Sequence, residues 1–364
     1  MPESAPASPH FGLHPIPVAE LPQLQQLILP TPWEVGPVQI YVILGDPLTL
    51  IDTGVKSPAS WAALEAAFDA LGHGLDEVER VILTHHHGDH LGQAQSLRDA
   101  GARLEVLAHE IEAPTIEAWS AERDEAIEAT NALFHEYGVP AAVIEKQSAM
   151  RRRWLLEDPP LCEATRVDRR LRDGERIACK DFELEVLHAP GHTAGHLLLC
   201  EPESQTLVTG DHLMGDAVPF TDTYFLEEPP DPRDALRRKP RFRGLVEYFA
   251  SLRRLRARSF RTILPAHGGV IDRPARAIDE ALLFYEVRVQ RIARALGRLA
   301  SARATATAWE VWQSLFPKAD PVTQMRTRML MVIGGLDVLE DQRRVEPRRR
   351  DDGVLTYAPL VNLS

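Results

Sequence analysis

Short runs of apolar residues in the first third of the chain predict β-strands. Two such runs, 38–44 and 48–52, flank a Gly-Asp-Pro segment with the composition of a turn. Residues 59–71 carry apolar side chains at helical spacing, and residues 81–83 predict a short buried strand. This strand–helix–strand order continues to about residue 108, so the fold class is expected to be mixed α/β.

The strand pattern disappears between about residues 109 and 160. Residues 121–137 and 140–155 instead have the spacing of helices. Insertions of this size usually cover an active site or mediate association. We therefore expect residues 115–155 to form a lid that sets substrate choice. Strands are predicted to resume beyond the insert, at 182–187, 196–200 and 206–208.

The last ninety or so residues have a different, mainly helical pattern. Apolar positions from Ile278 to Leu299 step by three or four, which predicts a long amphipathic helix. Thr307 and Glu310 fit a capping box, and a third helix is expected over residues 322–340. Residues 343–360 then read as a hairpin with an Asp-Gly turn. Three helices and a hairpin suggest a small winged-helix-like domain.

These patterns divide the chain into three parts. Residues 1–35 are proline-rich and are expected to be an extended lead-in. Residues 36–273 form the predicted catalytic domain, with the helical insert at about 109–160. Residues 274–364 form the winged-helix-like part.

Composition places the protein among soluble globular chains. It has 364 residues, of which 44% are hydrophobic and 26% charged. No apolar run approaches the roughly 18 residues that a membrane-spanning helix needs, and the N-terminus lacks the basic start and apolar segment of a secretory signal. Three cysteines without CxxC spacing fit a reducing compartment. We expect a cytoplasmic protein with no membrane partner.

The charge distribution bears on nucleic-acid binding. A formal net charge of -12 disfavours non-specific binding to nucleic acid. Arginine and lysine are nevertheless concentrated between Arg233 and Arg261. The favoured interpretation of this stretch is a solvated helix surface, and phosphate binding is the alternative.

The strongest chemical signal follows the strand predicted at residues 81–83. His85, His87, Asp89 and His90 lie within six residues of one another. A loop leaving a strand can direct His85 and His87 to one metal ion, and Asp89 and His90 to a second. Imidazole with carboxylate suits zinc, iron or manganese better than calcium or magnesium.

Three further candidate ligands each come just after a predicted strand. They are His192, Asp211 and His267, each directly next to a glycine. Glycine allows the tight turns and close backbone approach that a metal site requires. All seven ligands are therefore expected to converge on one edge of a sheet sandwich.

This set of residues resembles the metal motifs of the metallo-β-lactamase superfamily over about residues 36–272. The resemblance implies an αββα sandwich that holds two divalent metal ions. It assigns His85, His87 and His192 to the first ion. Asp89, His90 and His267 are assigned to the second ion, and Asp211 bridges the two. Asp52, in Ile51-Asp52-Thr53-Gly54, matches an aspartate that orients the metal loop without binding metal.

Such a pair of metals implies a mechanism. Two cations about 3.5–4 Å apart can share a water molecule and lower its pKa toward neutrality, which gives a bridging hydroxide nucleophile. Asp89 is the candidate catalytic residue, because it can orient that hydroxide and carry a proton. Zinc is favoured as the metal, with iron and manganese as alternatives.

Other residues near the motifs carry weaker signals. His86 alternates with two ligands, so a packing or supporting role is favoured. His196 is a candidate supporting residue that either donates to a bound oxyanion or caps the next strand. For His212, a structural role is modestly favoured over a hydrogen bond to a ligand. Tyr224 and Phe225 are expected to fill core rather than line a pocket.

The resemblance also narrows the reaction. His87 stands where redox di-iron members carry Glu, which disfavours electron transfer. Residues 189–196 and 209–211 resemble hydroxyacylglutathione hydrolases of the glyoxalase II type. The C-terminal part resembles the lactamase-beta-like group, which includes acyl-carrier-protein thioesterases and an endoribonuclease.

The leading interpretation is a hydrolase that cleaves a thioester, ester or lactone, with a small acyl substrate that is either free or carrier-bound. The alternative is a metal-dependent nuclease that holds phosphates with its arginine-rich stretches. The acidic net charge weighs against the nuclease. The winged-helix-like part could serve as a docking module for a carrier or as a homodimer interface.

Overall fold

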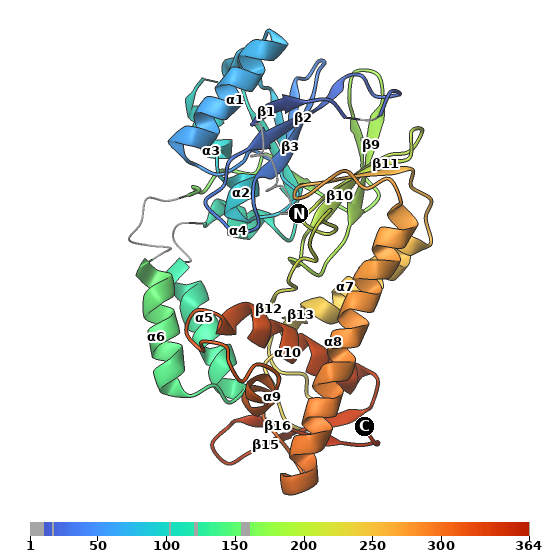
Figure 1. The fold of residues 1–364 in the computed structure, drawn as a ribbon. Coiled ribbons are helices and arrows are strands. Elements are labelled where there is room, and N and C mark those ends of the chain that lie inside the picture. Colours follow the sequence, from blue (N-terminus) through green and yellow to red (C-terminus); the bar gives the residue numbers. More distant parts are fainter. Residues whose placement is uncertain (1–10, 17, 102, 120–122, 154–160, 364) are drawn as a thin grey trace, which may run out of the picture.

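The computed structural model describes residues 11–16, 18–101, 103–119, 123–153 and 161–363. Two β-sheets form the upper part of the molecule in Figure 1. The first sheet contains, in spatial order, β1 (Gly12–His14), β2 (Leu24–Leu29), β3 (Val38–Ile43), β4 (Thr49–Ile51), β5 (Arg80–Ile82), β6 (Glu105–His109) and β7 (Arg169–Leu171). The second contains β14 (Thr262–Pro265), β11 (Thr206–Gly210), β10 (Leu197–Glu201), β9 (Glu183–His188) and β8 (Arg176–Ala178).

The two sheets pack face to face because successive side chains of a strand point to opposite sides. In β3, Tyr41 and Ile43 point toward the second sheet and contact a core that includes Val186 and Leu199. Ile40 and Val42, on the other face, belong to a separate core under the first sheet's helices. Strands buried on both faces read as continuous apolar runs, which is the pattern of β3.

Helices cover both outer faces of this sandwich. α1 (Pro58–Leu71) and α3 (Ala94–Asp99) pack on the first sheet through Leu64, Phe68 and Leu97. α7 (Gly244–Arg256) and the start of α8 (Pro274–Arg303) cover the second sheet. The arrangement confirms the expected αββα sandwich. The short helices η1 (Leu75–Glu77) and α2 (Gly88–Leu91) lie in loops of the first half.

The N-terminal segment differs from the expected lead-in. Residues 24–29 form β2, which pairs with all six residues of β3, from Leu24 opposite Ile43 to Leu29 opposite Val38. β1 then pairs with β2. Residues expected to precede the catalytic domain are therefore strands of its first sheet, and the boundary at residue 36 is corrected accordingly. Residues 1–10 of the lead-in lie outside the described part of the chain.

The insert after β6 is helical, as predicted. It contains α4 (Ala113–Glu117), α5 (Arg123–Glu136) and α6 (Ala141–Arg152). The ends of the two expected helices at 121–122 and 154–155 lie outside the described residues. Figure 1 shows α5 and α6 beside the C-terminal elements rather than over the sandwich. A lid role for the insert stays a prediction.

The insert is docked on the C-terminal part. The amide of Trp309 donates to the carbonyl of Tyr137 over 3.2 Å, and Arg349 pairs with Glu136 at 2.7 Å. Phe134 and Tyr137 are fully buried in the core that also holds Trp309. Insert and C-terminal part therefore share one apolar core.

The C-terminal elements follow the predicted order. α8 is followed by α9 (Ala308–Leu315), α10 (Met325–Asp341) and the hairpin β15 (Val345–Arg349)–β16 (Leu355–Pro359). The Thr307–Glu310 capping box at the start of α9 is confirmed. The winged-helix-like assignment of these elements stays a prediction. No helix in the described part of the chain is long and apolar enough to cross a membrane.

A buried ion pair joins the catalytic part to the C-terminal part. The small hairpin β12 (Thr223–Phe225)–β13 (Arg241–Arg243) carries Arg241, whose guanidinium contacts both carboxylate oxygens of Asp337 on α10. Asp337 is fully buried, and the side chain of Arg241 is 9% exposed. Arg241 also lies 5.5 Å from the ring centre of Tyr137 in the insert. The three parts of the chain thus meet at one charged contact.

Candidate metal centre

The seven predicted ligands come together at one edge of the sandwich. His85, His87, Asp89 and His90 follow β5, and His192 lies in the loop between β9 and β10. Asp211 follows β11, and His267 follows β14. The ligand atoms form two groups, and within each group all of them lie within 4.8 Å of one another. The sequence prediction that these residues converge is confirmed.

The first group contains His85, His87, His192 and Asp211. Nδ1 of His87 lies 2.9 Å from Nε2 of His85 and 3.0 Å from Nε2 of His192. Burial lowers the pKa of His85 and of His87 well below its usual value, so both imidazoles are neutral at pH 7. Three neutral ring nitrogens with converging lone pairs suit a divalent transition metal.

The second group contains Asp89, His90 and His267. Nε2 of His267 lies 3.2 Å from Oδ2 of Asp89, and Nε2 of His90 lies 3.7 Å from its Oδ1. Burial alone would lower the pKa of His90, but the carboxylates of Asp211 and Asp52 outweigh it and raise the pKa well above its usual value. A proton therefore competes with a metal ion for this imidazole.

Asp211 connects the two groups through its two oxygens. Oδ2 lies 3.4 Å from Nε2 of His192 and 4.0 Å from Nε2 of His85. Oδ1 lies 3.4 Å from Nε2 of His90 and 3.5 Å from Nε2 of His267. A carboxylate with one oxygen toward each group is placed to bridge two metal ions.

The outer ring nitrogens of the histidines are held by groups away from the centre. Nδ1 of His192 donates to the carbonyl of Phe220 over 2.8 Å, and Nδ1 of His267 donates to the carbonyl of Pro37 over 2.9 Å. A carbonyl can only accept, so each hydrogen bond places the proton on Nδ1 and leaves the Nε2 lone pair free. This fixes the tautomer that a metal requires.

Asp52 supports the metal loop, as the resemblance implied. Oδ1 accepts from the amide of Thr84 over 2.8 Å, and Oδ2 accepts from the Thr84 hydroxyl over 2.8 Å. Oδ2 also contacts Nδ1 of His90 at 2.8 Å. Its backbone has a positive φ of 63° at the end of β4, which turns the carboxylate toward the loop.

Unsatisfied buried atoms show that the residues fit metal ions. Nε2 of His90 and Oδ1 of Asp211 have no hydrogen-bond partner among the described residues, although both are buried. Buried polar atoms are normally paired, because an unpaired one costs about 1–3 kcal/mol. The two atoms lie 3.4 Å apart, beside Nε2 of His267 in the second group. Divalent cations held there would satisfy them.

The weaker histidine candidates occupy supporting positions. His196 is fully buried, its ring stacks on His85 at 4.7 Å, and its Nε2 accepts from the Asp211 amide over 3.2 Å. His196 thus contacts both Asp211 and His85, and its supporting role stays a prediction. His212 is also fully buried, and its ring packs at 4.8 Å against Tyr248. His86 turns away from the metal groups toward Glu112.

Glu112 is a residue that sequence reasoning missed. Its side chain is buried, and its carboxylate accepts hydrogen bonds from the backbone amides of His86 and Gly195, which lie in the two loops that carry the first group's histidines. Burial would raise the pKa of this carboxyl, but His86 and the hydrogen bonds hold it at about 2. The only signal in the sequence is an acid shortly after the β6 strand, which is common in loops.

Aromatic side chains border the first group. The ring of Phe220 lies 4.9 Å from that of His192 and 5.7 Å from that of His87. Trp119, at the start of the insert, lies 6.0 Å from the ring of His86. The guanidinium of Arg326, on α10, lies 5.8 Å from the ring centre of Phe220. Phe220 and Trp119 thus place aromatic rings near the first group, and the charged side chains of Glu112 and Arg326 also lie nearby.

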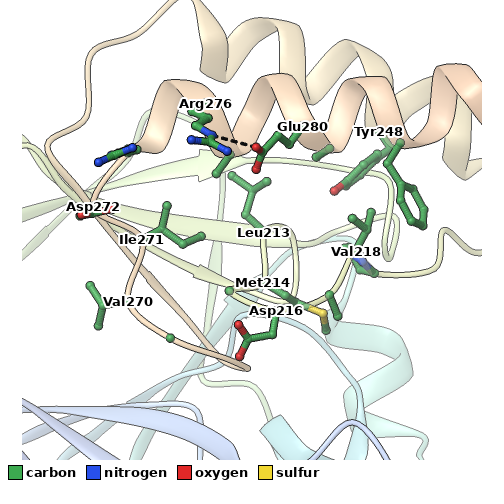
Figure 2. Close-up of a pocket in the computed structure, with 18 residues that line it drawn as sticks. Leu213, Met214, Asp216, Val218, Tyr248, Val270, Ile271, Asp272, Arg276 and Glu280 are labelled. Atoms are coloured by element: carbon green, nitrogen blue, oxygen red, sulfur yellow. Dashed lines mark hydrogen bonds and ion pairs between the residues drawn. The ribbon is translucent and has the colours of Figure 1, made fainter. Parts of the chain in front are cut away.

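A cavity of about 750 Å³ adjoins the centre (Figure 2). Its walls are the segments that follow Asp211 and His267, together with the first turns of α8. Leu213, Ile271 and Val218 form an apolar side, and the ion pair of Arg276 with Glu280 lies at its α8 side. None of the seven candidate ligands lines this cavity, so it is not the reaction site itself.

Sequence comparison identifies the family. The sequence pattern of the metallo-beta-lactamase superfamily matches residues 33–267. The probable metallo-hydrolase YqjP of Bacillus subtilis (strain 168) is 30% identical over 317 residues, which cover 87% of this chain and 92% of that protein. A hydroxyacylglutathione hydrolase of Brucella anthropi is 26% identical over 175 residues, which cover 47% of this chain and 46% of that protein.

Solved structures share the fold. A metallo-beta-lactamase family protein of Thermus thermophilus superposes with a TM-score of 0.71 at 25% identity, over 94% of this chain and 100% of that one. A beta-lactamase domain protein of Burkholderia ambifaria gives a TM-score of 0.71 at 19% identity, over 98% of this chain and 97% of that one. The chain therefore belongs to the metallo-beta-lactamase superfamily and is a metallo-hydrolase with His/Asp groups that could hold divalent metal ions.

Proposed function

We propose that the protein is a binuclear metal-dependent hydrolase that cleaves a thioester, an ester or a lactone. The observation that carries this proposal is the position of Asp211, whose two oxygens face the two separate ligand groups. Two bound metal ions, with zinc favoured over iron or manganese, would supply a hydroxide nucleophile and polarise the acyl carbonyl. No serine or cysteine nucleophile is needed.

Side chains of this protein hold the centre and carry the proton of the reaction. His85, His87 and His192 hold one side of the centre, and His90 and His267 hold the other. Asp89 is 8% exposed and presents Oδ1 and Oδ2 to the second group. One of these oxygens takes up the proton released during attack and passes it to the leaving group.

The surroundings of the centre favour an acyl substrate. The Phe220 ring packs against two of the first group's histidines, and Trp119 lies beyond His86. Aromatic side chains such as Phe220 suit an acyl group better than a chain of phosphates. Relatives of this chain include hydroxyacylglutathione hydrolases and an atrochrysone carboxyl ACP thioesterase of Aspergillus aculeatus, whose names describe acyl-thioester cleavage. The substrate is accordingly a small acyl compound, free or carrier-bound.

The arginine-rich stretch argues against the nuclease alternative. Arg256 pairs with Asp279 at 2.7 Å, and Arg258 pairs with Glu185 at 2.6 Å. Further arginines between residues 233 and 261 pair in the same way, namely Arg233 with Asp231, Arg238 with Asp234 and Glu340, Arg241 with Asp337, Arg254 with Asp173, and Arg261 with Glu20. Phosphate binding through these side chains would have to displace carboxylates that already neutralise them.

A side-by-side assay tests the proposal. Protein with measured metal content is given acyl-thioesters, lactones and short single-stranded RNA, and each reaction is repeated with Asp89→Ala. Asp99→Ala, an exposed change on α3, is the matched control. We expect acyl turnover in the native and Asp99→Ala proteins and its loss in Asp89→Ala. Cleavage of RNA that depends on Asp89, without any acyl turnover, would refute the acyl-hydrolase proposal.

A further inference from the structure

One buried carboxylate, that of Glu112, accepts hydrogen bonds from the two loops that carry the histidines of the first ligand group. Oε1 of Glu112 accepts from the amide of Gly195 over 2.7 Å. Oε2 accepts from the amide of His86 over 3.1 Å and also contacts Nδ1 of His86. Only 2% of Glu112 is exposed, so solvent does not compete for these donors.

The two loops that Glu112 joins come from different sheets. His86 lies between the ligands His85 and His87, directly after the first sheet's β5. Gly195 lies three residues after the ligand His192, directly before the second sheet's β10. The spacing of the three histidines therefore depends on how the two sheets are held at this edge, and Glu112 connects them there.

The close approach of Glu112 is built into the loop. A Cβ at Gly195 would lie 2.7 Å from Cγ of Glu112 and 2.8 Å from its backbone nitrogen. Those distances are too short for any side chain. Only glycine at this position lets the carboxylate reach both loops.

The second group has separate supports. His90 is held by Asp52, and His267 is held by the carbonyl of Pro37. No hydrogen bond of Glu112 given by the structure reaches either ligand. A change at Glu112 should therefore act on one metal position and spare the other.

We propose that Glu112 is a positioning residue that sets the spacing of His85, His87 and His192, and so the affinity for the first metal ion. Because Glu112 directly precedes α4, it also anchors the start of the helical insert to that ion's ligands. The inference rests on the two-metal centre of the proposed function but not on its substrate. The inference is tested by metal binding. An absence of acyl turnover in the native protein would therefore contradict the proposed substrate but not the role of Glu112.

Metal titration of the full chain tests this role. Native protein, Glu112→Gln and the control Glu110→Gln are stripped with a chelator and titrated with zinc and with cobalt(II). Glu110 is the matched control because its carboxylate pairs with Arg172, away from the centre. In Glu112→Gln the amide nitrogen must face an N–H donor on one side, whichever way it is turned. We expect one of the two ions to lose about 10–100-fold in affinity, the other to keep its affinity, and the cobalt(II) spectrum of one site to change.

A second variant approaches the same contact from the other side. Gly195→Ala keeps the Glu112 carboxylate, but the added methyl group pushes it away from the loop. The affinity for the same metal ion should therefore fall. If Glu112→Gln does not fold, Gly195→Ala decides the question. Native affinity for both ions in the folded variants would overturn the proposal. So would an equal loss of both ions together with a lower melting temperature of the apoprotein, because that result indicates a general structural role.

Discussion

Nδ1 of His90 donates to Oδ2 of Asp52 over 2.8 Å, although the two residues are 38 positions apart in the chain. The same carboxylate accepts from the amide and the hydroxyl of Thr84, directly before the metal loop. One aspartate at the end of β4 thus fixes both the start of the loop and the direction of one ligand ring. Supports of this kind keep the ligating nitrogen oriented toward the metal.

Replacing Asp52 should weaken the second metal position. In Asp52→Ala the ring of His90 loses its carboxylate partner, and the amide of Thr84 loses its acceptor. We expect about a 10–100-fold loss of affinity for one ion, measured by competition with a zinc-binding dye. Asp69→Ala, exposed on α1, is the control. Unchanged zinc binding in Asp52→Ala would show that the hydrogen bond does not orient the ligand.

Asp211→Asn should disrupt the bridge between the two groups. The asparagine amide keeps one oxygen that can bind a metal ion. In place of the second oxygen it has an NH2 group, which donates hydrogen bonds and does not bind the metal ion of the other group. We expect fewer than two metal ions per chain, by elemental analysis, and loss of most of the hydrolytic activity. Asp216→Asn, exposed five residues later, should retain both. Full metal content and rate in Asp211→Asn would remove this residue from the centre.

Asp337→Ala should destabilise the junction of the three parts of the chain. It leaves the guanidinium of Arg241 buried without its main partner, and removing one member of a buried ion pair costs about 3–5 kcal/mol. Urea unfolding measures this loss. Glu136→Ala breaks the more exposed pair with Arg349 and should cost only about 0–1 kcal/mol. A similar small effect in both variants would contradict a buried charged junction.

Stability should fall in mild acid because of His109. Burial and the stacked ring of His188, 4.1 Å away, lower the pKa of His109 to about 4. Its neutral Nδ1 also accepts from the amide of Ile111 over 3.3 Å. The unfolded chain takes up this proton near pH 6.5 and the folded chain only near pH 4, so the free energy of unfolding declines across that window as pH falls.

The His109→Phe variant isolates this contribution. Phenylalanine keeps a flat ring against His188 but cannot take up a proton, so its unfolding free energy should change less between pH 6.5 and pH 4 than that of the native protein. Chemical denaturation at several pH values gives the comparison. Parallel curves for the two proteins would assign the acid sensitivity to other groups.

Much of the fold and nearly all of the metal centre could be predicted from the sequence. The seven candidate ligands follow strand ends that local apolar patterns reveal, and the Thr307–Glu310 capping box marks the start of α9. Such features depend on residues a few positions apart. The mainly proline-rich lead-in concealed β2, because a strand paired along its length with β3 is defined by its partner rather than by its own composition.

By itself, the sequence identified the seven candidate ligands, the helices of the insert and of the C-terminal part, and several of the strands, since periodicity and motif spacing are local properties. Only the tertiary structure decided which distant groups support them. Glu112 and Asp337 have no motif around them, and each acquires its role when separate elements close on it, two metal loops for Glu112 and the β12–β13 hairpin for Asp337. A buried carboxylate is defined by the donors that surround it, and those donors come from parts of the chain that only folding brings into contact.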